Sequence, residues 1–333
     1  MRVGIVGAGL QGKRRARALK ELDDNQLIIV ADINQDAAMH LAKDMDCQAT
    51  TRWEEVVDCK EVDMVLVCTP PHLHSVISIA SMRNGKHVLC EKPMGRNQEE
   101  AEQILNVARQ TGMKLKCGLN LRHHPGIRQA WQWFNEGLIG EIHFIRCHYG
   151  IGGRPNYHQE WRAKVEISGG GEVMDQGIHT LDLCRWFLGD FSQVFGMLST
   201  HFWDIAPLED NAFILLRSKK EQIASINVSW TQWKPSFSFD ILGHDGYILI
   251  EGLGGVYGVE RVRKGKRAFL EPFQEEVVEF PGEDLSWKEE LQEFISAIKE
   301  NREPIGNGVD ALEALKLAHF VYQSAQKKEV VKI

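Results

Sequence analysis

No stretch of this sequence approaches the roughly 20 consecutive apolar residues that an α-helix needs to cross a bilayer. The 333-residue chain opens directly on the apolar segment RVGIVG, without the charged and then apolar order of a secretory signal peptide. No cysteine pair has the CxxC spacing, and the seven cysteines are an odd number. We therefore expect no membrane span, no disulfide framework, and a reducing cytoplasmic location in which the cysteines are small buried side chains.

Long basic stretches and metal-binding motifs are also missing. The formal net charge is −7, from 39 Lys and Arg against 46 Asp and Glu. The one basic run, from Lys13 to Arg17, is too short to form the basic stripe of a nucleic-acid binder. The chain contains no HExxH, no GxSxG, and no cysteine and histidine cluster with metal-ligand spacing. We expect neither a nucleic-acid partner nor a metal site.

What the first 118 residues do contain is an alternation of short apolar runs and helix-length amphipathic segments. The apolar runs are 3–7, 27–31, 64–68, 87–91 and 114–118, and the segments between them include 11–22, 36–45, 74–84 and 97–111. Continuous apolar strands separated by helices predict a parallel sheet that is covered on both faces. Right-handed crossovers make this a doubly wound, Rossmann-type α/β domain, which we place at residues 1–120.

The pattern changes after about residue 120. A helix over 126–136 and the strand EIHFIRCHYG are followed, after a further helix, by alternating segments at 194–202, 211–218, 222–230, 237–242 and 247–251. This period is typical of half-buried strands, and Gly246 after His244 and Asp245 predicts a hairpin turn. We predict an α+β domain over 121–333 with a large, mostly antiparallel open sheet whose uncovered face a partner subunit could cover. Two helices close the chain, and we expect the last one, about 309–327, to pack back on the first domain.

A glycine-rich turn lies between the first strand and the first helix. Gly7-Ala8-Gly9-Leu10-Gln11-Gly12 fits G-x-G-x-x-G. Gly7 makes the tight turn, Gly9 lets the backbone approach a pyrophosphate, and Gly12 lets helix and strand pack closely. The helix N-terminus at Leu10 and Gln11 then offers free N–H groups and a positive dipole to the phosphates.

An acid at the end of the second strand extends this pattern. Asp32 lies 20 residues after Gly12, the spacing of the acid that binds a ribose 2′-hydroxyl. A carboxylate at this position repels a 2′-phosphate, so the pattern favours NAD over NADP. NADP stays the alternative, because Arg14 or Arg15 in the first helix could contribute to phosphate binding.

Two further segments follow strands at the same edge of the sheet, where ligands of open α/β sheets bind. Thr69 and Pro70 follow the third apolar run and are predicted to contact the cofactor, as is His74. For His72 and His74 a capping or packing role is equally open. Glu91-Lys92-Pro93 follows the fourth run, and Glu91 and Lys92 are also predicted to contact the cofactor. The Lys92 ammonium group can bind a substrate oxygen near the nicotinamide.

The segment 169–179, GGGEVMDQGIH, begins a predicted helix that continues to Gly189. Asp175 and His179 are four residues apart, so on an α-helix they lie one turn apart on the same face. An acid and an imidazole behind a flexible glycine run are typical of a pair that meets a ligand. The alternative is a surface pair on an ordinary helix.

In this order and spacing, GxGxxG, Asp32, TPPHLH, EKP and GGGxxxDxGxH resemble the glucose–fructose oxidoreductase and inositol dehydrogenase family (Gfo/Idh/MocA) over essentially the whole chain. The resemblance implies a Rossmann domain followed by an α/β domain whose open sheet supports homodimers or homotetramers. It also implies hydride transfer between a nicotinamide and a sugar, nucleotide-sugar or cyclitol carbon.

The resemblance also implies roles for residues. Lys92, Asp175 and His179 match the catalytic lysine, aspartate and histidine, and the Lys92–Pro93 bond is expected to be cis. Residues that match substrate or cofactor positions are Asn120 and Arg122 of an N-x-R segment and the pair Trp161 and Arg162. The chain departs from the family at His123-His124, where an aromatic residue is common, which puts the substrate contacts of this loop in doubt.

The oxidation of an alcohol suits the side chains of Lys92, Asp175 and His179. Oxidising a secondary alcohol removes the O–H proton while hydride leaves the same carbon, so a base with a pKa near the working pH must reach the hydroxyl. An imidazole has an ordinary pKa of about 6.5. We therefore assign His179 as the general acid and base. Lys92 would polarise the reacting oxygen, and Asp175 would bind the substrate hydroxyls. The alternatives are an NAD-dependent glycosidase that acts by transient oxidation and a non-catalytic regulator that senses NAD or sugar, although a regulator has no need to retain all three residues.

Overall fold

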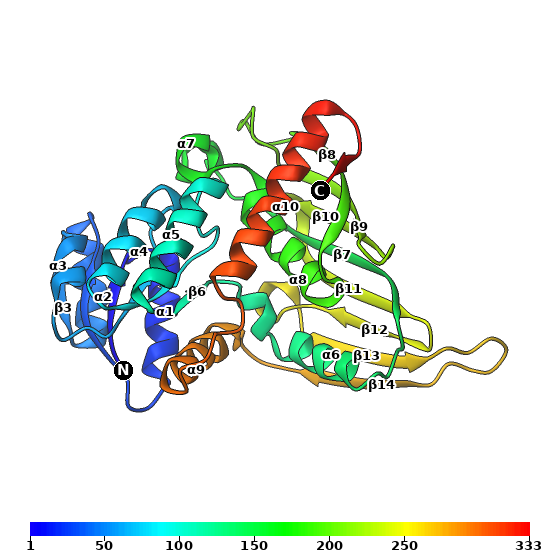
Figure 1. Cartoon of the computed structure of the whole chain (residues 1–333), viewed down its shortest axis with the longest axis horizontal. Coiled ribbons are helices and arrows are strands. Elements are labelled where there is room, and N and C mark those ends of the chain that lie inside the picture. The colour runs from blue at the N-terminus through cyan, green and yellow to red at the C-terminus, as the bar shows by residue number, and fades with distance from the viewer. The chain divides into compact units, whose positions relative to one another are not determined.

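The computed structural model describes residues 1–333, which form two compact units (Figure 1). Unit 1 comprises Met1–Asn120, Glu166–Gly169 and Ser286–Leu312. Unit 2 comprises Leu121–Val165, Gly170–Leu285 and Glu313–Ile333. Both units are therefore assembled from segments that lie far apart in the sequence.

Unit 1 contains a six-stranded parallel sheet in the order β3-β2-β1-β4-β5-β6. The strands are β1 (Arg2–Val6), β2 (Gln26–Ala31), β3 (Gln48–Thr50), β4 (Met64–Val67), β5 (His87–Cys90) and β6 (Leu115–Cys117). The direction of the strand order reverses between β1 and β4, and ligands of such sheets bind beyond the carboxyl ends of the strands at this point. The predicted doubly wound parallel sheet is confirmed. β3 was not predicted, because a three-residue strand is too short to show a period.

The helices of unit 1 follow the predicted pattern with the short α3, η1 and α7 in addition. They are α1 (Leu10–Lys20), α2 (Gln35–Met45), α3 (Trp53–Asp58), η1 (Pro71–Leu73), α4 (His74–Arg83), α5 (Gln98–Thr111) and α9 (Ser286–Lys299), together with the short α7 (Val165–Ser168) at its edge. Local caps begin two of them: Asn34 accepts the Ala37 N–H at 3.1 Å, and Asn97 accepts the Glu100 N–H at 2.9 Å. α3 was not predicted, since its six residues cover less than two turns.

α9 joins the core of unit 1 from the C-terminal part of the chain. Leu291, Phe294 and Ile295 of α9 belong to the same buried cluster as apolar residues of α1 and the central strands. Of α10 (Gly308–Lys327), the helix expected to pack back on the first domain, residues up to Leu312 belong to unit 1 and residues from Glu313 to unit 2.

Unit 2 contains a nine-stranded sheet in the order β14-β13-β12-β11-β7-β10-β9-β8-β15. The strands are β7 (Ile142–Gly152), β8 (Phe191–Ser199), β9 (Asn211–Ser218), β10 (Ile223–Ser229), β11 (Thr231–Gly243), β12 (Gly246–Glu251), β13 (Glu260–Lys266), β14 (Glu275–Phe280) and β15 (Val331–Lys332). Only β7 and β10 pair in parallel, so the predicted mostly antiparallel sheet is confirmed. β13 and β14 were not predicted, because their many charged side chains obscure the alternation of apolar and polar residues.

One face of this sheet is covered by helices, and the other is open. In β9, Ala212 and Ile214 point into the core, whereas Phe213 and Leu215 are exposed. The helices of unit 2 are α6 (Pro125–Asn135), the π-helix η5 (Val173–Gly177), α8 (Ile178–Leu188) and most of α10. Its 3₁₀ turns are η2 (Asn120–His123), η3 (Tyr157–Gln159), η4 (Trp161–Ala163) and η6 (Gly255–Tyr257), and η2 begins on the last residue of unit 1. Figure 1 shows α6 and α8 over the same face of the sheet. The period-two alternation therefore buries one face of the sheet and leaves an apolar surface on the other.

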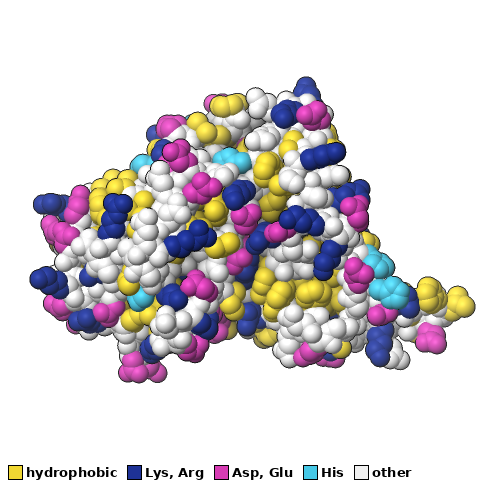
Figure 2. All heavy atoms as spheres, viewed as in Figure 1, with side chains coloured by type: hydrophobic (Ala, Val, Ile, Leu, Met, Phe, Trp, Pro, Cys, Tyr) yellow, Lys and Arg dark blue, Asp and Glu magenta, His cyan; other side chains and the backbone are white.

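The loop between β13 and β14 carries a second exposed apolar group. Phe269, Leu270 and Phe273 are exposed there, and Figure 2 shows hydrophobic side chains at the tip of this hairpin. Elsewhere on the face seen in Figure 2, acidic and basic side chains are interspersed. No helix of the chain combines the length and the apolar character that a membrane crossing needs.

Candidate active site

The glycine-rich turn of unit 1 is tight at two positions and open at a third. Gly7 has φ +102°, and a Cβ on it would lie 2.6 Å from the Cys68 carbonyl oxygen. A Cβ on Gly12 would lie 1.9 Å from the Gly7 carbonyl oxygen. A Cβ on Gly9 would meet no atom within 4 Å. The turn thus packs against its own strand and helix while leaving the space above Gly9 to a ligand, as a pyrophosphate requires.

The start of α1 and its surroundings fit an anionic, hydroxyl-rich ligand. Gly9 is the N-cap residue of α1, which has no side-chain cap and no acid in its first turn. The first N–H groups of the helix, around exposed Leu10, are therefore left to a ligand above Gly9. Gln11 Oε1, Thr69 Oγ1 and His72 Nδ1 are buried and make no hydrogen bond within the chain. Pro70, between the last two, precedes the η1 turn. Because buried polar atoms normally find a partner, these atoms fit a dinucleotide bound at this edge.

Asp32 lies at the end of β2 and holds the turn. Its Oδ2 accepts the Ala8 N–H at 2.7 Å, and its Oδ1 accepts the Asn34 N–H at 2.8 Å. Each carboxylate oxygen has a further lone pair for a ribose hydroxyl. The predicted ribose acid therefore also fixes the backbone of the phosphate-binding turn.

His74 serves the packing role that was left open for it. The ring is fully buried, with Nδ1 2.7 Å from the Pro93 carbonyl oxygen and Nε2 2.7 Å from the Thr69 carbonyl oxygen. Burial lowers the pKa of His74, although both hydrogen bonds act in the opposite direction. Both ring nitrogens face main-chain oxygens, so the imidazole has no nitrogen left for the predicted cofactor contact. It joins the two loops that follow β4 and β5.

The carboxylate of Glu91 likewise pairs with a side chain of the protein. Its Oε1 accepts from Arg15 Nε at 2.8 Å, and Arg15 NH1 lies 2.6 Å from Glu290 Oε2. All three side chains are buried, and the Arg15 guanidinium lies 4.7 Å from the centre of the Trp287 ring. Burial lowers the pKa of Arg15, but Glu91 and then Glu290 raise it by more, so the guanidinium stays charged. Glu91 thus connects the loop that carries Lys92 to α1 and α9.

Lys92 follows β5 at the carboxyl edge of the sheet. Its side chain is half-buried, and the Lys92–Pro93 bond is cis, as the family resemblance implied.

In unit 2 the segment that carries Asp175 and His179 is not one α-helix. Val173–Gly177 form a π-helix, and α8 begins at Ile178. Single π-helical turns inside helices are frequent at functional sites, and their i→i+5 bonding adds a residue to the turn. The expectation of regular α-helical spacing between the two residues is therefore wrong. His179 is buried in the first turn of α8, and Asp175 is half-buried in the π-helix.

The predicted Trp161-Arg162 pair meets this segment. Arg162 Nε lies 3.8 Å from Asp175 Oδ2, and its guanidinium lies 4.3 Å from the centre of the Trp161 ring. Arg162 also lies 3.5 Å from Glu160 Oε2. A guanidinium between two carboxylates, backed by an aromatic ring, gives this side of unit 2 both hydrogen-bond donors and acceptors.

Tyr157 is a candidate that the sequence did not reveal. It is buried, its hydroxyl makes no hydrogen bond within the chain, and its ring packs 4.7 Å from that of Trp230. Burial raises the pKa of Tyr157 far above its ordinary value, and the nearby Asp175 carboxylate raises it further. Nothing in the spacing of GRPNYHQEW distinguishes this tyrosine, because only the fold brings it near Asp175.

The N-x-R segment is held inside the protein. Asn120 is buried in unit 1 and donates to Ser286 Oγ at 2.8 Å. Arg122, in unit 2, forms a bidentate ion pair with Asp182 of α8, at 2.7 Å from Nε and 2.6 Å from NH2. His124, in the departure from the family pattern, lies 3.0 Å from Glu260 Oε2. The structure accordingly gives Asn120 and Arg122 contacts within their own units, and their substrate contacts stay a prediction.

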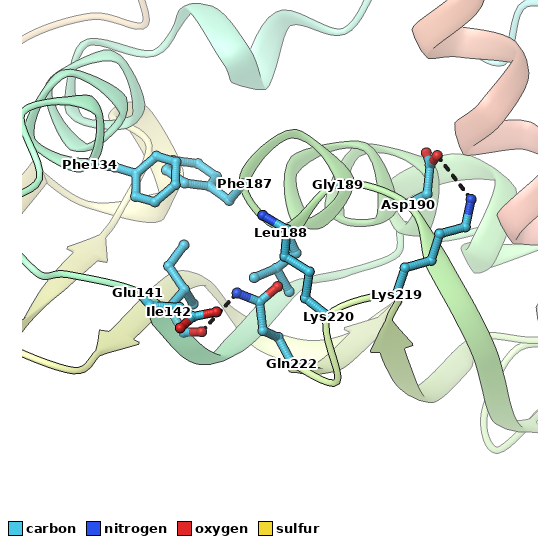
Figure 3. A pocket seen from close by; sticks show the side chains of 10 residues that line it. All are labelled: Phe134, Glu141, Ile142, Phe187, Leu188, Gly189, Asp190, Lys219, Lys220 and Gln222. Atoms are coloured by element: carbon cyan, nitrogen blue, oxygen red, sulfur yellow. Dashed lines mark hydrogen bonds and ion pairs between the residues drawn. The ribbon is translucent and has the colours of Figure 1, made fainter.

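A pocket of about 400 Å³ lies at the other end of α8. Figure 3 shows Phe134 and Phe187 on one side of it and the Asp190–Lys219 ion pair on the other. His179 and Leu188 are nine residues apart on α8, or about 13 Å at 1.5 Å per residue. This pocket is therefore separate from the His179 end of the helix. No group of three or more His, Cys, Asp or Glu side chains is arranged to hold a metal ion.

Comparisons with known proteins agree with the fold and with an NAD-binding domain. Residues 1–119 match the family described as "Oxidoreductase family, NAD-binding Rossmann fold", and residues 127–249 match the "GFO/IDH/MocA C-terminal domain". The chain is 26% identical to myo-inositol 2-dehydrogenase of Thermotoga maritima over 100% of this chain and 98% of that protein. It is 29% identical to levoglucosan dehydrogenase of Pseudarthrobacter phenanthrenivorans, over 60% of this chain and only 54% of that enzyme. A solved structure of levoglucosan dehydrogenase in complex with NADH shares the fold, with a TM-score of 0.91, 22% identity, and coverage of 100% and 99%.

The fold and the glycine-rich site define an NAD-binding oxidoreductase built from a Rossmann domain and a second, open-sheet domain. The chain belongs to the GFO/IDH/MocA family, whose two characteristic domains it contains. The predicted family, fold class, enzyme class and NAD cofactor are confirmed.

Proposed function

We propose that this protein transfers a hydride between NAD and a secondary alcohol or ketone carbon of a sugar, nucleotide sugar or cyclitol. The observation that carries the proposal is the match of both domains to an oxidoreductase family. A match to myo-inositol 2-dehydrogenase over the full length of both chains supports the substrate class. We also propose that the two domains divide near residue 120.

We assign three residues to the reaction. Bound NAD supplies the carbon that accepts or returns the hydride. His179 takes the hydroxyl proton as the alcohol becomes a ketone and returns it in the reverse reaction. Lys92 donates a hydrogen bond to the same oxygen and stabilises its developing negative charge. Asp175, with Arg162 at 3.8 Å, holds neighbouring substrate hydroxyls. Lys92 belongs to unit 1 and the other residues to unit 2, so neither unit alone should be active.

The test is a panel of sugars, nucleotide sugars and cyclitols, including myo-inositol and levoglucosan, read by NADH absorbance in both directions. We expect one class to be turned over, and His179→Ala and Lys92→Ala to lose at least about 100-fold in kcat/KM. Activity of both variants at the wild-type level would refute the assigned roles. Glycoside cleavage without NADH accumulation would indicate the glycosidase, and NAD binding without turnover of any compound would indicate the regulator. Repeating the panel with NADP tests the preference that Asp32 predicts.

We further propose that the open face of the nine-stranded sheet pairs with a second copy of this chain to form a homodimer, or half of a homotetramer. Met197 and Phe213 on this face are 63% and 56% exposed, and Phe144 and Leu215 are exposed on the same side of the sheet. Exposed apolar patches of this kind mark protein interfaces. Light scattering should report a dimer or tetramer for the wild type and monomers for Phe213→Glu. A monomeric wild type would refute the interface. The seven free cysteines support a cytoplasmic location.

A further inference from the structure

The helical segment that carries Asp175 begins without a local cap. Glu172, at the N-cap position of the π-helix Val173–Gly177, makes no side-chain capping hydrogen bond to the first backbone N–H groups of that helix. The first N–H groups of a helix need acceptors, and a buried helix start without them is costly. The acceptors come from Glu209, which lies 36 residues beyond Val173 in the sequence.

Glu209 binds two consecutive backbone amides at this helix start. Its main-chain carbonyl oxygen accepts the Glu172 N–H at 3.0 Å, and its carboxylate Oε1 accepts the Val173 N–H at 2.9 Å. An acid at the N-terminal end of a helix is also favoured by the helix dipole. Glu209 therefore replaces the missing local cap from a distant part of the chain.

Tyr322 of α10 completes the arrangement. Its hydroxyl donates to Glu209 Oε1 at 2.8 Å and accepts the Gly171 N–H at 3.2 Å. The carbonyl oxygen of Gly171 in turn accepts the Asp175 N–H at 3.0 Å. A continuous path of hydrogen bonds thus runs from Tyr322 through Gly171 to the backbone of Asp175.

The glycines give these two side chains room. A Cβ on Gly171 would lie 2.3 Å from the Glu209 carbonyl oxygen, and a Cβ on Gly170 would lie 2.2 Å from the Tyr322 hydroxyl oxygen. Both distances are far below van der Waals contact. The glycine run, expected to be flexible, is a surface of close contact at these positions.

We propose that Glu209 and Tyr322 are positioning residues that fix the π-helix and thereby direct Asp175 and His179 toward the substrate. The catalytic consequence rests on the proposed function, whereas the effect on the backbone does not. Reacting groups must be held in place closely, and supporting hydrogen bonds supply that order. NAD binding involves the glycine-rich turn of unit 1 and should be independent of these two residues.

The first test measures hydrogen exchange by mass spectrometry in the wild type, Tyr322→Phe and Glu209→Gln. The matched control is Tyr247→Phe, which removes a Tyr–Glu hydrogen bond of 2.9 Å to Glu275 within the same unit. Amides of residues 169–179 should exchange about tenfold faster in the two test variants and at the wild-type rate in the control. Unchanged exchange at 169–179, or equal acceleration throughout unit 2, would overturn the proposal.

The second test measures catalysis with NAD and myo-inositol, or with whichever compound of the panel the wild type turns over best. Both variants should lose about tenfold or more in kcat, while the Kd for NAD stays within twofold of the wild type. Because the two residues act as one unit, the double variant should be no worse than the poorer single variant. Additive losses, or an unchanged kcat, would overturn the proposal. If the wild type turns over no compound, the proposed function fails, and the exchange experiment still decides whether Glu209 and Tyr322 hold this backbone.

Discussion

The protein contains two glycine-rich turns that lead into helices, and the first has an open position where the second has none. At Gly9 in the first turn, the position of a missing Cβ is open, with no atom within 4 Å. In the second turn, the corresponding positions of Gly169, Gly170 and Gly171 lie 2.7, 2.2 and 2.3 Å from atoms of Arg96, Tyr322 and Glu209. The first turn keeps space for a ligand above Gly9, whereas in the second turn backbone and side-chain atoms of the protein fill the corresponding space.

The helices that follow these turns are held by different forces. α1 is fixed by Arg15, whose buried guanidinium pairs with Glu91 and Glu290. The start of the π-helix is fixed by hydrogen bonds that Glu209 and Tyr322 accept from the backbone N–H groups of Val173 and Gly171. A buried charge whose partner is removed costs much more than a lost neutral hydrogen bond, so the two regions should respond differently to substitution.

The largest effect is expected for Arg15→Met. This change leaves Glu91 and Glu290 buried without their cation, and should lower the free energy of unfolding by about 3–5 kcal/mol. Chemical denaturation measures the loss. Arg17→Met, at an exposed position of the same helix, is the control and should change stability by less than about 0.5 kcal/mol. Adding Glu290→Gln to Arg15→Met should recover part of the lost unfolding free energy. A further additive loss would show that Arg15 and Glu290 do not act as one coupled cluster.

Gly12→Ala should be the next most severe change. The added methyl group would lie 1.9 Å from the Gly7 carbonyl oxygen, and the backbone on both sides must shift. We expect a loss of about 2–3 kcal/mol in the free energy of unfolding, although alanine is otherwise favoured over glycine in a helix. A thermal melt unchanged from the wild type would show that the turn is looser than described.

Gly9→Ala is the matched counterpart, with the same added group in the same turn. The methyl group meets no protein atom, so stability should change by less than about 0.5 kcal/mol. It occupies the space through which a pyrophosphate approaches, so the affinity for NAD should fall about tenfold or more. Calorimetric titration with NAD measures this. Wild-type affinity would show that the open space above Gly9 is not the phosphate site.

The smallest effect concerns pH and the second turn. Burial raises the pKa of Glu209 above its ordinary value of 4.5. A raised pKa in the folded state means that the contribution of Glu209 to stability is complete below about pH 4.5 and declines as the pH rises toward the folded value. Relative to Glu209→Gln, the wild type should therefore lose part of its stability advantage over this range.

Denaturation of both proteins between pH 4 and 8 tests this, with Glu275→Gln at an exposed position as the control. Tyr322, the titratable group that hydrogen-bonds to Glu209, has its pKa raised by burial well above this range, so it does not contribute. An advantage of the wild type that grows with pH would contradict the sign.

Much of the fold follows from local patterns. The apolar runs of residues 1–118 correspond to five of the six strands of the parallel sheet, because buried parallel strands carry continuous apolar sequence. The two short elements β3 and α3 were not predicted, since segments of three and six residues carry too little periodicity. In unit 2, β13 and β14 were not predicted because their side chains are largely charged.

For the site, the spacing of Gly7, Gly9, Gly12 and Asp32 led to the NAD-binding turn, since backbone and phosphate geometry constrain these residues locally. Spacing does not reveal partners that lie far away in the sequence. His74 was expected to contact the cofactor, yet its two ring nitrogens face the carbonyl oxygens of Thr69 and Pro93. Arg122 was expected to contact substrate, yet it pairs with Asp182.

The two-domain order, the NAD-binding turn and the family could all be predicted from short motifs and local patterns along the chain. The folded structure was needed to show why the glycines of the second turn are required and what fixes the helix beyond them. Glu209 and Tyr322 reach that turn from 36 and 151 residues away, measured to Val173 and Gly171. Hydrogen bonds and close contacts of this kind leave no period in the sequence, since they depend only on where folding places the two segments.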